Sequence, residues 1–438
     1  MSCASGKRPF ARAEPMIQID AEPMRNAVHR ASHRARFTPR LYLVLVAAGA
    51  LLVAPGCSSC KKSPSAEAAR TGALTPGASI PTPPARAAYV TNNGSDSVSV
   101  IDRDGDTGTT VPVDLDPDAR EAPHHLAIDV ASKSIFVALA FPPEPGKKKD
   151  PHASHGAASD VGRLARLDLD SLAANAEVDV DENPGDVVLT HDRSRVLVTH
   201  FDMKRAMDVA ARGGASPATM FAHLVVLDAR TMKRLGSRAV CTAPHGIAVT
   251  RDDRTAFIAC YGSDELAMVD LSAEGFPTSR IPLGSSPGVP GVPRYGPYSA
   301  TLSPDEKLVI VADLEGQDIR VFDRASKRFV PERSVPLAAK AFMPAFIDAS
   351  TLLVPTQAPD GLVRVDIETA KVTGRGSLTK AECALPHVVK VAKDGRIYLV
   401  CEGNHTQPGS VLEIERETLA TKKRWNVGVY PDGIELGE

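Results

Sequence analysis

One short pattern recurs seven times along the chain and restricts its possible folds more than any other feature. Each copy is a strand-like segment of alternating residues that ends in an acidic residue. The acidic residues that close the seven copies are Asp102, Asp168, Asp228, Asp270, Asp323, Asp366 and Glu415. Successive copies lie 42 to 66 residues apart, and periods in this range are typical of propellers and solenoids.

A second pattern precedes each of the last six copies. It consists of a proline, a strand, a polar turn and another strand, as in PHGIAVTRDDRTAFIAC from Pro244 to Cys260. The turns often contain Asp or Gly, which supply the backbone angles that tight hairpins need. The first copy has no such opening strand, but the chain ends in PDGIEL, Pro431 to Leu436, which matches PHGIAV.

The split repeat predicts an all-β fold that closes on itself. The last strand of the chain would pair with the segment AYVTNNGSDSVSVID, Ala88 to Asp102, and complete the blade that this segment begins. We therefore predict a seven-bladed β-propeller with about four antiparallel strands in each blade, because closure removes exposed sheet edges. A linear β-solenoid is the alternative, but it would not need a split repeat.

The segment from Ala88 to Asp102 closely resembles the YVTN family of β-propeller repeats, and the resemblance extends more weakly over residues 87–438. It implies a protein that is exported or surface-bound, and many members of the family have no known activity. The wider fold group includes lactonases that act on sugar lactones, the haem d1 domain of nitrite reductase and the copper propeller of nitrous oxide reductase. Such breadth means that the fold alone does not imply an activity.

The first 56 residues have the features of a secretory signal. Several arginines precede an uncharged stretch from Leu41 to Gly56 that is too short to span a membrane, and Met24 is the start that we favour. Cys57 follows VAPG in a sequence that resembles a bacterial lipobox, which implies a diacylated cysteine; Ser58 resembles the outer-membrane sorting pattern. An ordinary secreted protein is the alternative. Residues 57–87 would then form a flexible Pro-rich tether, and residues 88–438 the propeller.

Composition narrows the choice of partners. The 438 residues are 43% hydrophobic, which suits a globular core, and the net charge is −2. Because no basic field is present, we expect no nucleic-acid partner. We expect a monomer in the cell envelope that reaches the membrane, most plausibly the outer membrane, only through its lipid anchor.

The residue after each proline should lie at one mouth of the central channel. In blade order these residues are Asp432, His124, Gly185, His245, Tyr298, Ala345 and His387. His124, His387 and Asp432 belong to adjacent blades, and two imidazoles with one carboxylate can bind a divalent transition metal. The alternative is that these side chains only bind loop backbone at the strand starts.

Three further residues are candidates for a ligand rim at the same mouth. They are His245, Tyr298 and His200. We expect His245 to lie across the ring, too far from the other histidines to share one small ion with them, although it could contact a larger ligand. No cofactor is certain, and the divalent transition metal is the only one that the sequence suggests.

Four of the seven cysteines occur in two matching pairs. Cys241 and Cys260 flank one blade hairpin, and Cys383 and Cys401 flank another, each with a Cys-x-x-Pro-His start. In an antiparallel hairpin these positions can approach to disulfide distance, and export favours oxidation. We predict both disulfides; the alternatives are a soft-metal site that uses the thiolates, or free thiols. Cys60 stays without an assigned role.

Three loops are longer than the others, and insertions of this kind often form the binding face. They are Phe141–Gly162, which contains His152 and His155, Phe201–Met220, which has a helix-like centre, and the Pro/Gly-rich Ile281–Gly296. Solvated surface loops are the alternative.

The sequence favours a binding or scaffold module without enzymatic activity, which would bind a protein or small molecule through its loop-rich face. A lactonase-like or metal-dependent hydrolase that uses His124, His387 and Asp432 is the first alternative, and a redox or cofactor-binding propeller is the second. Motifs such as HExxH and CxxCH do not occur in the sequence.

Overall fold

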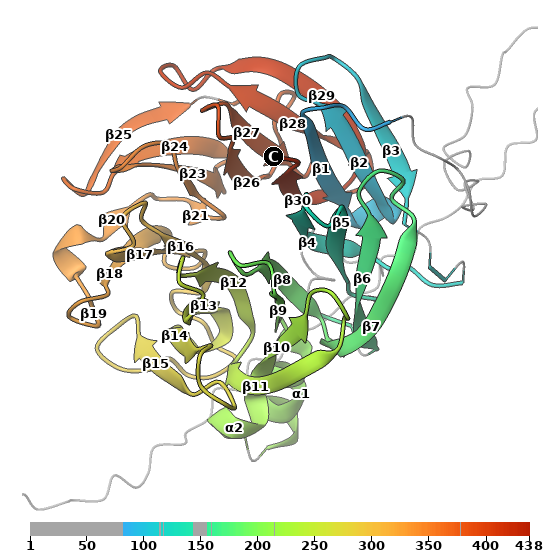
Figure 1. The fold of residues 1–438 in the computed structure, drawn as a ribbon. Coiled ribbons are helices and arrows are strands. Elements are labelled where there is room, and N and C mark those ends of the chain that lie inside the picture. Colours follow the sequence, from blue (N-terminus) through green and yellow to red (C-terminus); the bar gives the residue numbers. More distant parts are fainter. Residues whose placement is uncertain are drawn as a thin grey trace, which may run out of the picture. The chain divides into compact units, whose positions relative to one another are not determined.

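The computed structural model describes residues 82–438 apart from 114, 117, 143–155, 159, 214 and 377. These residues belong to one compact unit, in which seven antiparallel sheets follow one another around a ring (Figure 1). The predicted seven-bladed propeller is therefore confirmed. The signal, the Cys57 anchor and most of the predicted tether lie outside the described residues. Within the described part of the chain, no helix has the length and apolar character that a membrane span requires.

The first blade joins the two ends of the described chain. From the channel outward its strands are β30 (Pro431–Leu436), β1 (Ala87–Asn92), β2 (Ser97–Asp102) and β3 (Gly108–Pro112). β1 and β30 pair antiparallel, with Val90 opposite Ile434, and Figure 1 shows β30 beside the blue N-terminal strands. The last strand thus closes the ring, as the split repeat predicts.

The other six blades are each continuous in sequence. Blade two contains β4 (Pro123–Asp129), β5 (Ser134–Leu139), β6 (Val161–Asp168) and β7 (Ala174–Glu182). Blade three contains β8 (Pro184–Leu189), β9 (Arg195–His200), β10 (Ala222–Asp228) and β11 (Arg234–Cys241). Blade four contains β12 (Pro244–Val249), β13 (Thr255–Cys260), β14 (Glu265–Asp270) and β15 (Thr278–Pro282).

The last three blades follow the same order from the channel outward. Blade five contains β16 (Pro297–Leu302), β17 (Leu308–Asp313), β18 (Asp318–Asp323), β19 (Arg328–Phe329) and β20 (Val335–Pro336). Blade six contains β21 (Lys340–Ala341), β22 (Ala345–Phe346), β23 (Thr351–Gln357), β24 (Gly361–Asp366) and β25 (Lys371–Gly376). Blade seven contains β26 (Pro386–Val391), β27 (Ile397–Cys401), β28 (Pro408–Ile414) and β29 (Thr421–Val429).

The acidic residue at the end of each third strand has a local structural role. Asp228, for example, accepts hydrogen bonds from the backbone N–H and the hydroxyl of Thr231, both at 2.7 Å. Asp323 and Asp366 make the same pair of bonds to the residue three positions later. Short polar side chains that bind nearby backbone in this way stabilise turns. The repeated acidic residue is therefore a turn residue.

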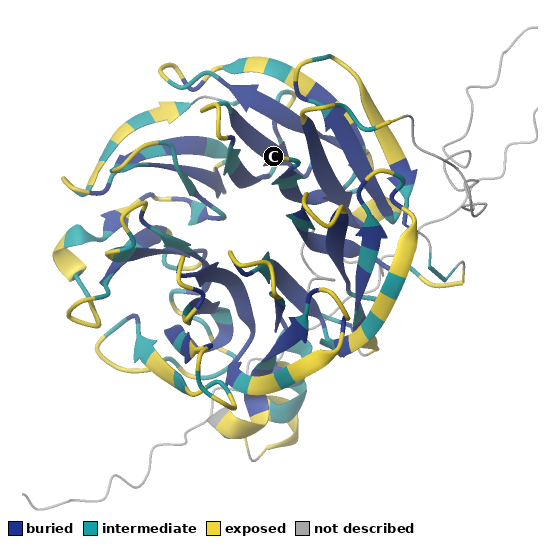
Figure 2. Ribbon diagram, in the orientation of Figure 1, coloured by how far each residue is buried: buried dark blue, intermediate teal, exposed yellow. Residues whose placement is uncertain are grey.

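The core lies between neighbouring blades. One apolar cluster combines Phe257 and Leu266 of blade four with Val309 and Phe322 of blade five. Figure 2 shows that the inner strands are almost entirely buried, while the outermost strands mostly alternate between exposed residues and residues of intermediate exposure. Each sheet therefore packs through both faces, and only its outer edge reaches solvent.

The long loop between β9 and β10 contains the expected helix. It forms α1 (Met203–Arg212) and α2 (Pro217–Met220). The Asp202 carboxylate accepts a hydrogen bond from the backbone N–H of Arg205 at 3.0 Å, and this bond caps the start of α1. Short 3-10 turns occur at η2 (Asn93–Ser95), η3 (Tyr261–Ser263) and η4 (Pro331–Arg333).

Candidate metal centre

A β-bulge follows the proline at the start of most inner strands. In β4 the register with β5 shifts between Pro123 and Leu126, and β8, β12, β16 and β26 shift at the same place. Successive residues of a regular strand point to opposite faces, but a bulge re-aims them. The rings of His124 and His125 consequently lie together, with centroids 4.4 Å apart.

His245 joins these two histidines. One ring nitrogen of each of His124, His125 and His245 lies within 4.8 Å of one ring nitrogen of each of the others, and all three side chains are buried. The expectation that His245 lies too far away is therefore wrong. The intervening blade contributes Gly185, where an added Cβ would stand 3.4 Å from Cδ2 of His245. Gly185 therefore lies directly beside the ring of His245, and a larger side chain at this position would contact that ring.

The Nδ1 atom of each of these three histidines faces an oxygen atom. The distances are 3.0 Å from His124 to the carbonyl of Gly185, 2.8 Å from His125 to the carboxylate of Asp186, and 3.2 Å from His245 to the carbonyl of Tyr298. An oxygen acceptor places the ring proton on Nδ1 and leaves the lone pair on Nε2. Hydrogen bonds of this kind fix the tautomer of histidines that bind metals.

Hydrogen bonds from neighbouring elements hold the cluster in place. The hydroxyl of Thr199 donates to the carbonyl of His245 at 2.7 Å, and the hydroxyl of Thr91 donates to that of His124. Asp186, which holds His125, accepts the backbone N–H of Ile247 at 2.8 Å. The three imidazoles are thus positioned by blades one, three, four and five before any ion binds.

The three residues that the sequence singles out also lie together. Asp432 has one oxygen 3.3 Å from Nε2 of His124 and the other 2.9 Å from Nδ1 of His387. His125, His387 and Asp432 form a second group of possible ligands, again within 4.8 Å. Nε2 of His387, however, lies 3.1 Å from the hydroxyl of Tyr298. Nε2 of His387 therefore pairs with a hydroxyl, whereas Nδ1 faces the Asp432 carboxylate as an ion pair without a hydrogen bond of regular geometry.

The ring of His125 has a hydrogen-bond partner at Nδ1, which lies 2.8 Å from Asp186. Its Nε2 is buried and makes no hydrogen bond to any residue in the described part of the chain. A buried polar atom without a partner is costly and calls for an explanation. Because Nδ1 is bound to Asp186, a Lewis acid beside Nε2 would supply that partner.

Burial and charge set the protonation of the cluster. Burial lowers the pKa of His124 to about 4, so this ring is neutral near pH 7. Burial would raise the pKa of Asp432, but His124 and His387 hold it well below the usual range. Burial also lowers the pKa of His387, but Glu402 and Asp432 outweigh that effect and raise it. A neutral imidazole and an ionised carboxylate are the forms that bind a metal cation.

Sequence reasoning missed the roles of His125, Asp186 and Glu402. Glu402 has one oxygen 3.3 Å from Nδ1 of His387 and the other 2.6 Å from Nε2 of His405. The doubled histidine in PHHLAID was the available signal for His125, because no other copy carries a histidine at the second position after the proline. Only the bulge makes that second histidine face the channel.

The other predicted residues occupy different positions. Tyr298 stacks on His245 with ring centroids 4.0 Å apart, so it belongs to the cluster. The ring of His200 does not belong to the cluster. Its Nε2 accepts a hydrogen bond from the backbone N–H of Asp181 at 3.0 Å, and its Nδ1 lies 2.8 Å from the carbonyl oxygen of His223. His152 and His155 lie outside the described residues. Both predicted disulfides, Cys241–Cys260 and Cys383–Cys401, are present, and such bonds indicate an extracytoplasmic compartment.

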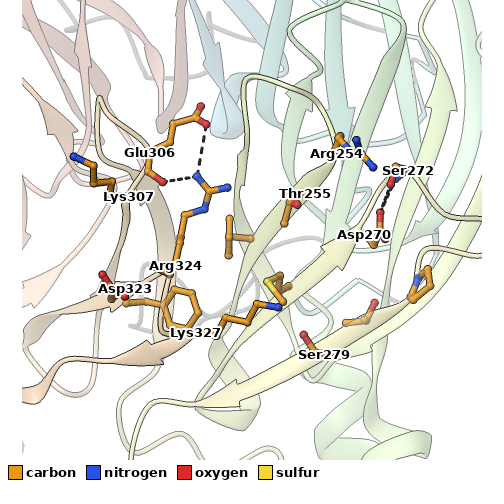
Figure 3. A pocket seen from close by; sticks show the side chains of 16 residues that line it. Arg254, Thr255, Asp270, Ser272, Ser279, Glu306, Lys307, Asp323, Arg324 and Lys327 are labelled. Carbon is orange, nitrogen blue, oxygen red and sulfur yellow. Dashed lines mark hydrogen bonds and ion pairs between the residues drawn. The ribbon is translucent and has the colours of Figure 1, made fainter.

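The larger cavity lies away from the histidines, and a much smaller one adjoins His124. A groove of about 770 Å³ separates blades four and five, with Arg324 next to Glu306 in its wall (Figure 3). Arg254 and Thr255, which also line it, follow the end of β12 opposite to His245. A much smaller cavity, about 20 Å³, adjoins His124 and Tyr430. It has room for about one water molecule.

The fold and the cluster together define a seven-bladed propeller with a histidine-rich channel mouth. No protein-family model matches the sequence, and no curated protein matches it. Solved structures share the fold. A periplasmic gluconolactonase from Pseudomonas aeruginosa is 17% identical, with a TM-score of 0.56 over 80% of this chain and 98% of that one. A protein from Lactobacillus plantarum is 13% identical, with a TM-score of 0.57 over 80% and 98%.

The dihydro-haem d1 dehydrogenase NirN, in complex with DHE, is a third similar structure. It is 15% identical, with a TM-score of 0.51 over 79% of this chain, and this chain spans 66% of its length. At these identities the similarity shows the propeller fold alone.

Proposed function

We propose that this protein binds a divalent transition-metal ion at the mouth of its channel, through Nε2 of His124, His125 and His245. The observation that carries the proposal is the shared orientation of the three rings. Each Nδ1 faces an oxygen of the protein, and the three side chains converge within 4.8 Å. Imidazole nitrogens suit Zn²⁺, Cu²⁺, Ni²⁺ and Fe²⁺ rather than Mg²⁺ or Ca²⁺.

The geometry requires a modest adjustment on binding. Zinc–nitrogen bonds of about 2.0–2.1 Å place tetrahedral ligands roughly 3.4 Å apart, which is closer than the 4.8 Å limit within which these atoms lie. Small rotations of the buried rings would close the difference. Asp432, with an oxygen 3.3 Å from Nε2 of His124, is a carboxylate that could complete the set. The trio of His124, His387 and Asp432 is the competing ligand set.

We also propose that the protein acts outside the cytoplasm, attached to the cell envelope. The two disulfides support an extracytoplasmic site of action, and diacylation of Cys57 would tether the propeller to the envelope, with its loop-rich face free to bind a partner. Replacement of Cys57 by alanine should release the protein from membranes during fractionation. Retention of the variant in the membrane fraction would contradict the lipid anchor.

A metal-dependent hydrolase is the second candidate. Three protein ligands would leave a coordination position for water, as in catalytic zinc sites. Asp432, which lies 3.3 Å from Nε2 of His124 and 2.9 Å from Nδ1 of His387, would be the carboxylate available to such a water. The similar structures include a gluconolactonase. The cavity of about 20 Å³ beside His124 is, however, too small for a sugar lactone, so this function would need the mouth to open.

Calorimetric titration tests the metal site. The protein is refolded without metal or chelator and titrated with Zn²⁺ and Co²⁺, with saturation at one ion per chain expected. His125→Ala and His245→Ala should lose stoichiometric binding, because each removes one ligand. His387→Ala should keep it, and His191→Ala serves as the control because His191 is half exposed and pairs with Asp253 instead.

Two results would overturn the assignment. Absence of saturable binding by the wild-type protein would remove the metal site altogether. Binding that survives His245→Ala but is lost in His387→Ala and Asp432→Asn would replace the three-histidine set by the competing trio.

A further inference from the structure

We propose that the Cys241–Cys260 disulfide positions His245 for metal binding, so that the metal affinity of the protein depends on the oxidation state of this bond. The inference rests on the proposed metal site and adds to it a covalent element that controls the site. It assigns a function to a bond that the fold alone would explain as a stabilising cross-link.

The disulfide lies at the start of the segment that carries His245. Cys241 is the last residue of β11 in blade three, and Cys260 is the last residue of β13 in blade four. The bond therefore joins two blades, and His245 follows only four residues after Cys241. Both cysteines are fully buried. Any movement of Cys241 away from β13 would have to be absorbed within these four residues.

Other contacts leave the segment little freedom while the bond is intact. The carbonyls of Thr242 and Ala243 accept backbone hydrogen bonds from Gly262 at 3.0 Å and Tyr261 at 3.1 Å. The carbonyl of His245 accepts the Thr199 hydroxyl. The disulfide fixes one end of this path and Thr199 fixes the other, so the imidazole is held before an ion binds.

The second disulfide supplies an internal control. Cys383 precedes His387 by four residues, just as Cys241 precedes His245, and it bonds to Cys401 at the end of β27. His387 is not one of the three proposed ligands. Both bonds close loops of similar length, with sequence separations of 19 and 18, so their contributions to stability should be alike. Only one of them should affect the metal.

The chemistry of opening is ordinary thiol–disulfide exchange. The S–S bond breaks and two thiols form, with two electrons and two protons supplied by a dithiol that is itself oxidised to a disulfide. The freed Cys241 no longer holds β11 against β13, and the backbone before His245 can shift. Loss of a group that positions a metal ligand typically weakens metal binding about 10–100-fold.

Paired variants test the inference. Zn²⁺ affinity is measured by competition with a chromophoric chelator for Cys241→Ala/Cys260→Ala and for Cys383→Ala/Cys401→Ala, with thermal unfolding recorded for both. We expect similar losses of Tm, but a loss of affinity of about tenfold or more only in the first variant. The absorption bands of bound Co²⁺ should change in the first variant alone, which a general loss of stability would not produce.

A measurement on the wild-type protein covers the case in which a variant does not fold. If the disulfide favours metal binding, bound metal must favour the disulfide by the same factor. Equilibration in buffers of reduced and oxidised glutathione, followed by an acid quench, alkylation and peptide mapping, should show that Zn²⁺ raises the oxidised fraction of Cys241–Cys260 and leaves that of Cys383–Cys401 unchanged.

The outcomes separate the two proposals. A wild-type protein that binds no metal contradicts the proposed function. Wild-type protein that binds metal, with equal affinity in both variants or an equal effect of Zn²⁺ on the oxidised fractions of both disulfides, overturns this inference alone. Tighter binding by the reduced protein would also overturn it, because the thiolates would then be ligands themselves.

Discussion

In blades three and four, the segment before the inner strand is attached to the end of the second strand by different chemistry. In blade four the residue three positions before the inner-strand proline, Cys241, is bonded to Cys260 at the end of the second strand. In blade three the corresponding residues are Asp181 and His200, and the backbone N–H of Asp181 donates to Nε2 of His200 at 3.0 Å. Blade one uses a third version, in which Asn92 accepts the backbone N–H of Gly428 at 3.0 Å.

The comparison shows that the joint between an outer strand and the next blade needs a fixed contact, but not a particular one. It also explains His200, which sequence reasoning placed on the ligand rim. A histidine at this position can bridge two backbone groups, because one ring nitrogen donates and the other accepts. Its burial serves the joint between blades rather than the channel.

The largest effect on stability should come from the covalent joint. Removal of the disulfide in Cys241→Ala/Cys260→Ala should lower the free energy of unfolding by about 3 kcal/mol. The two cysteines are 19 residues apart in sequence, and without the bond the unfolded chain between them gains conformational entropy. Denaturant unfolding in the absence of metal measures this change. A loss below about 1 kcal/mol would mean that the other contacts of the segment hold the joint unaided.

The hydrogen-bonded joint of blade three should be weaker. His200→Ala removes the acceptor of Asp181 and the contact with the carbonyl of His223, which together should cost about 2 kcal/mol. The same unfolding experiment applies. Replacement of His191, which is half exposed, is the matched control. If His200→Ala were as stable as the control, the blade-three joint would not depend on the imidazole.

The two joints should also respond differently to acid. Burial lowers the pKa of His200 to about 4, below its ordinary value of 6.5. The unfolded state therefore takes up a proton first, and the stability that the neutral imidazole provides is present above pH 6.5 and lost as the pH falls toward 4. Unfolding measured across this window should show a smaller loss in His200→Gln, whereas removal of the disulfide should leave the slope unchanged. Equal slopes in the wild type and His200→Gln would contradict this.

The smallest effect should come from the exposed part of the blade-three joint. Arg234 pairs with Asp181 at 2.9 Å, but its side chain is 38% exposed, and ion pairs at the surface contribute less than about 1 kcal/mol. Arg234→Ala should therefore change the unfolding free energy only slightly, and added salt should reduce the difference further. A larger loss would assign the joint to this ion pair rather than to His200.

The fold could be predicted because its signals are local and repeated. Alternating strands and turn residues constrain only neighbouring residues, and seven copies reinforce one another. The split repeat from Ala88 to Leu436 then shows which two distant strands complete one blade. The two disulfides followed from the same register, since Cys241 and Cys383 hold equivalent positions before their prolines. The adjacency of His124, His387 and Asp432 also came from blade order alone.

The composition of the histidine cluster required the tertiary structure. A strand without a bulge would point His125 away from the channel, and a larger side chain at Gly185 would contact the ring of His245. Sequence by itself determined the number of blades, their closure and which cysteines pair, because these depend on spacing along the chain. The structure also decides which imidazoles meet, because their positions depend on the backbone bulge and, for His245, on the absence of a side chain at Gly185. Packing around the channel axis sets both of these features.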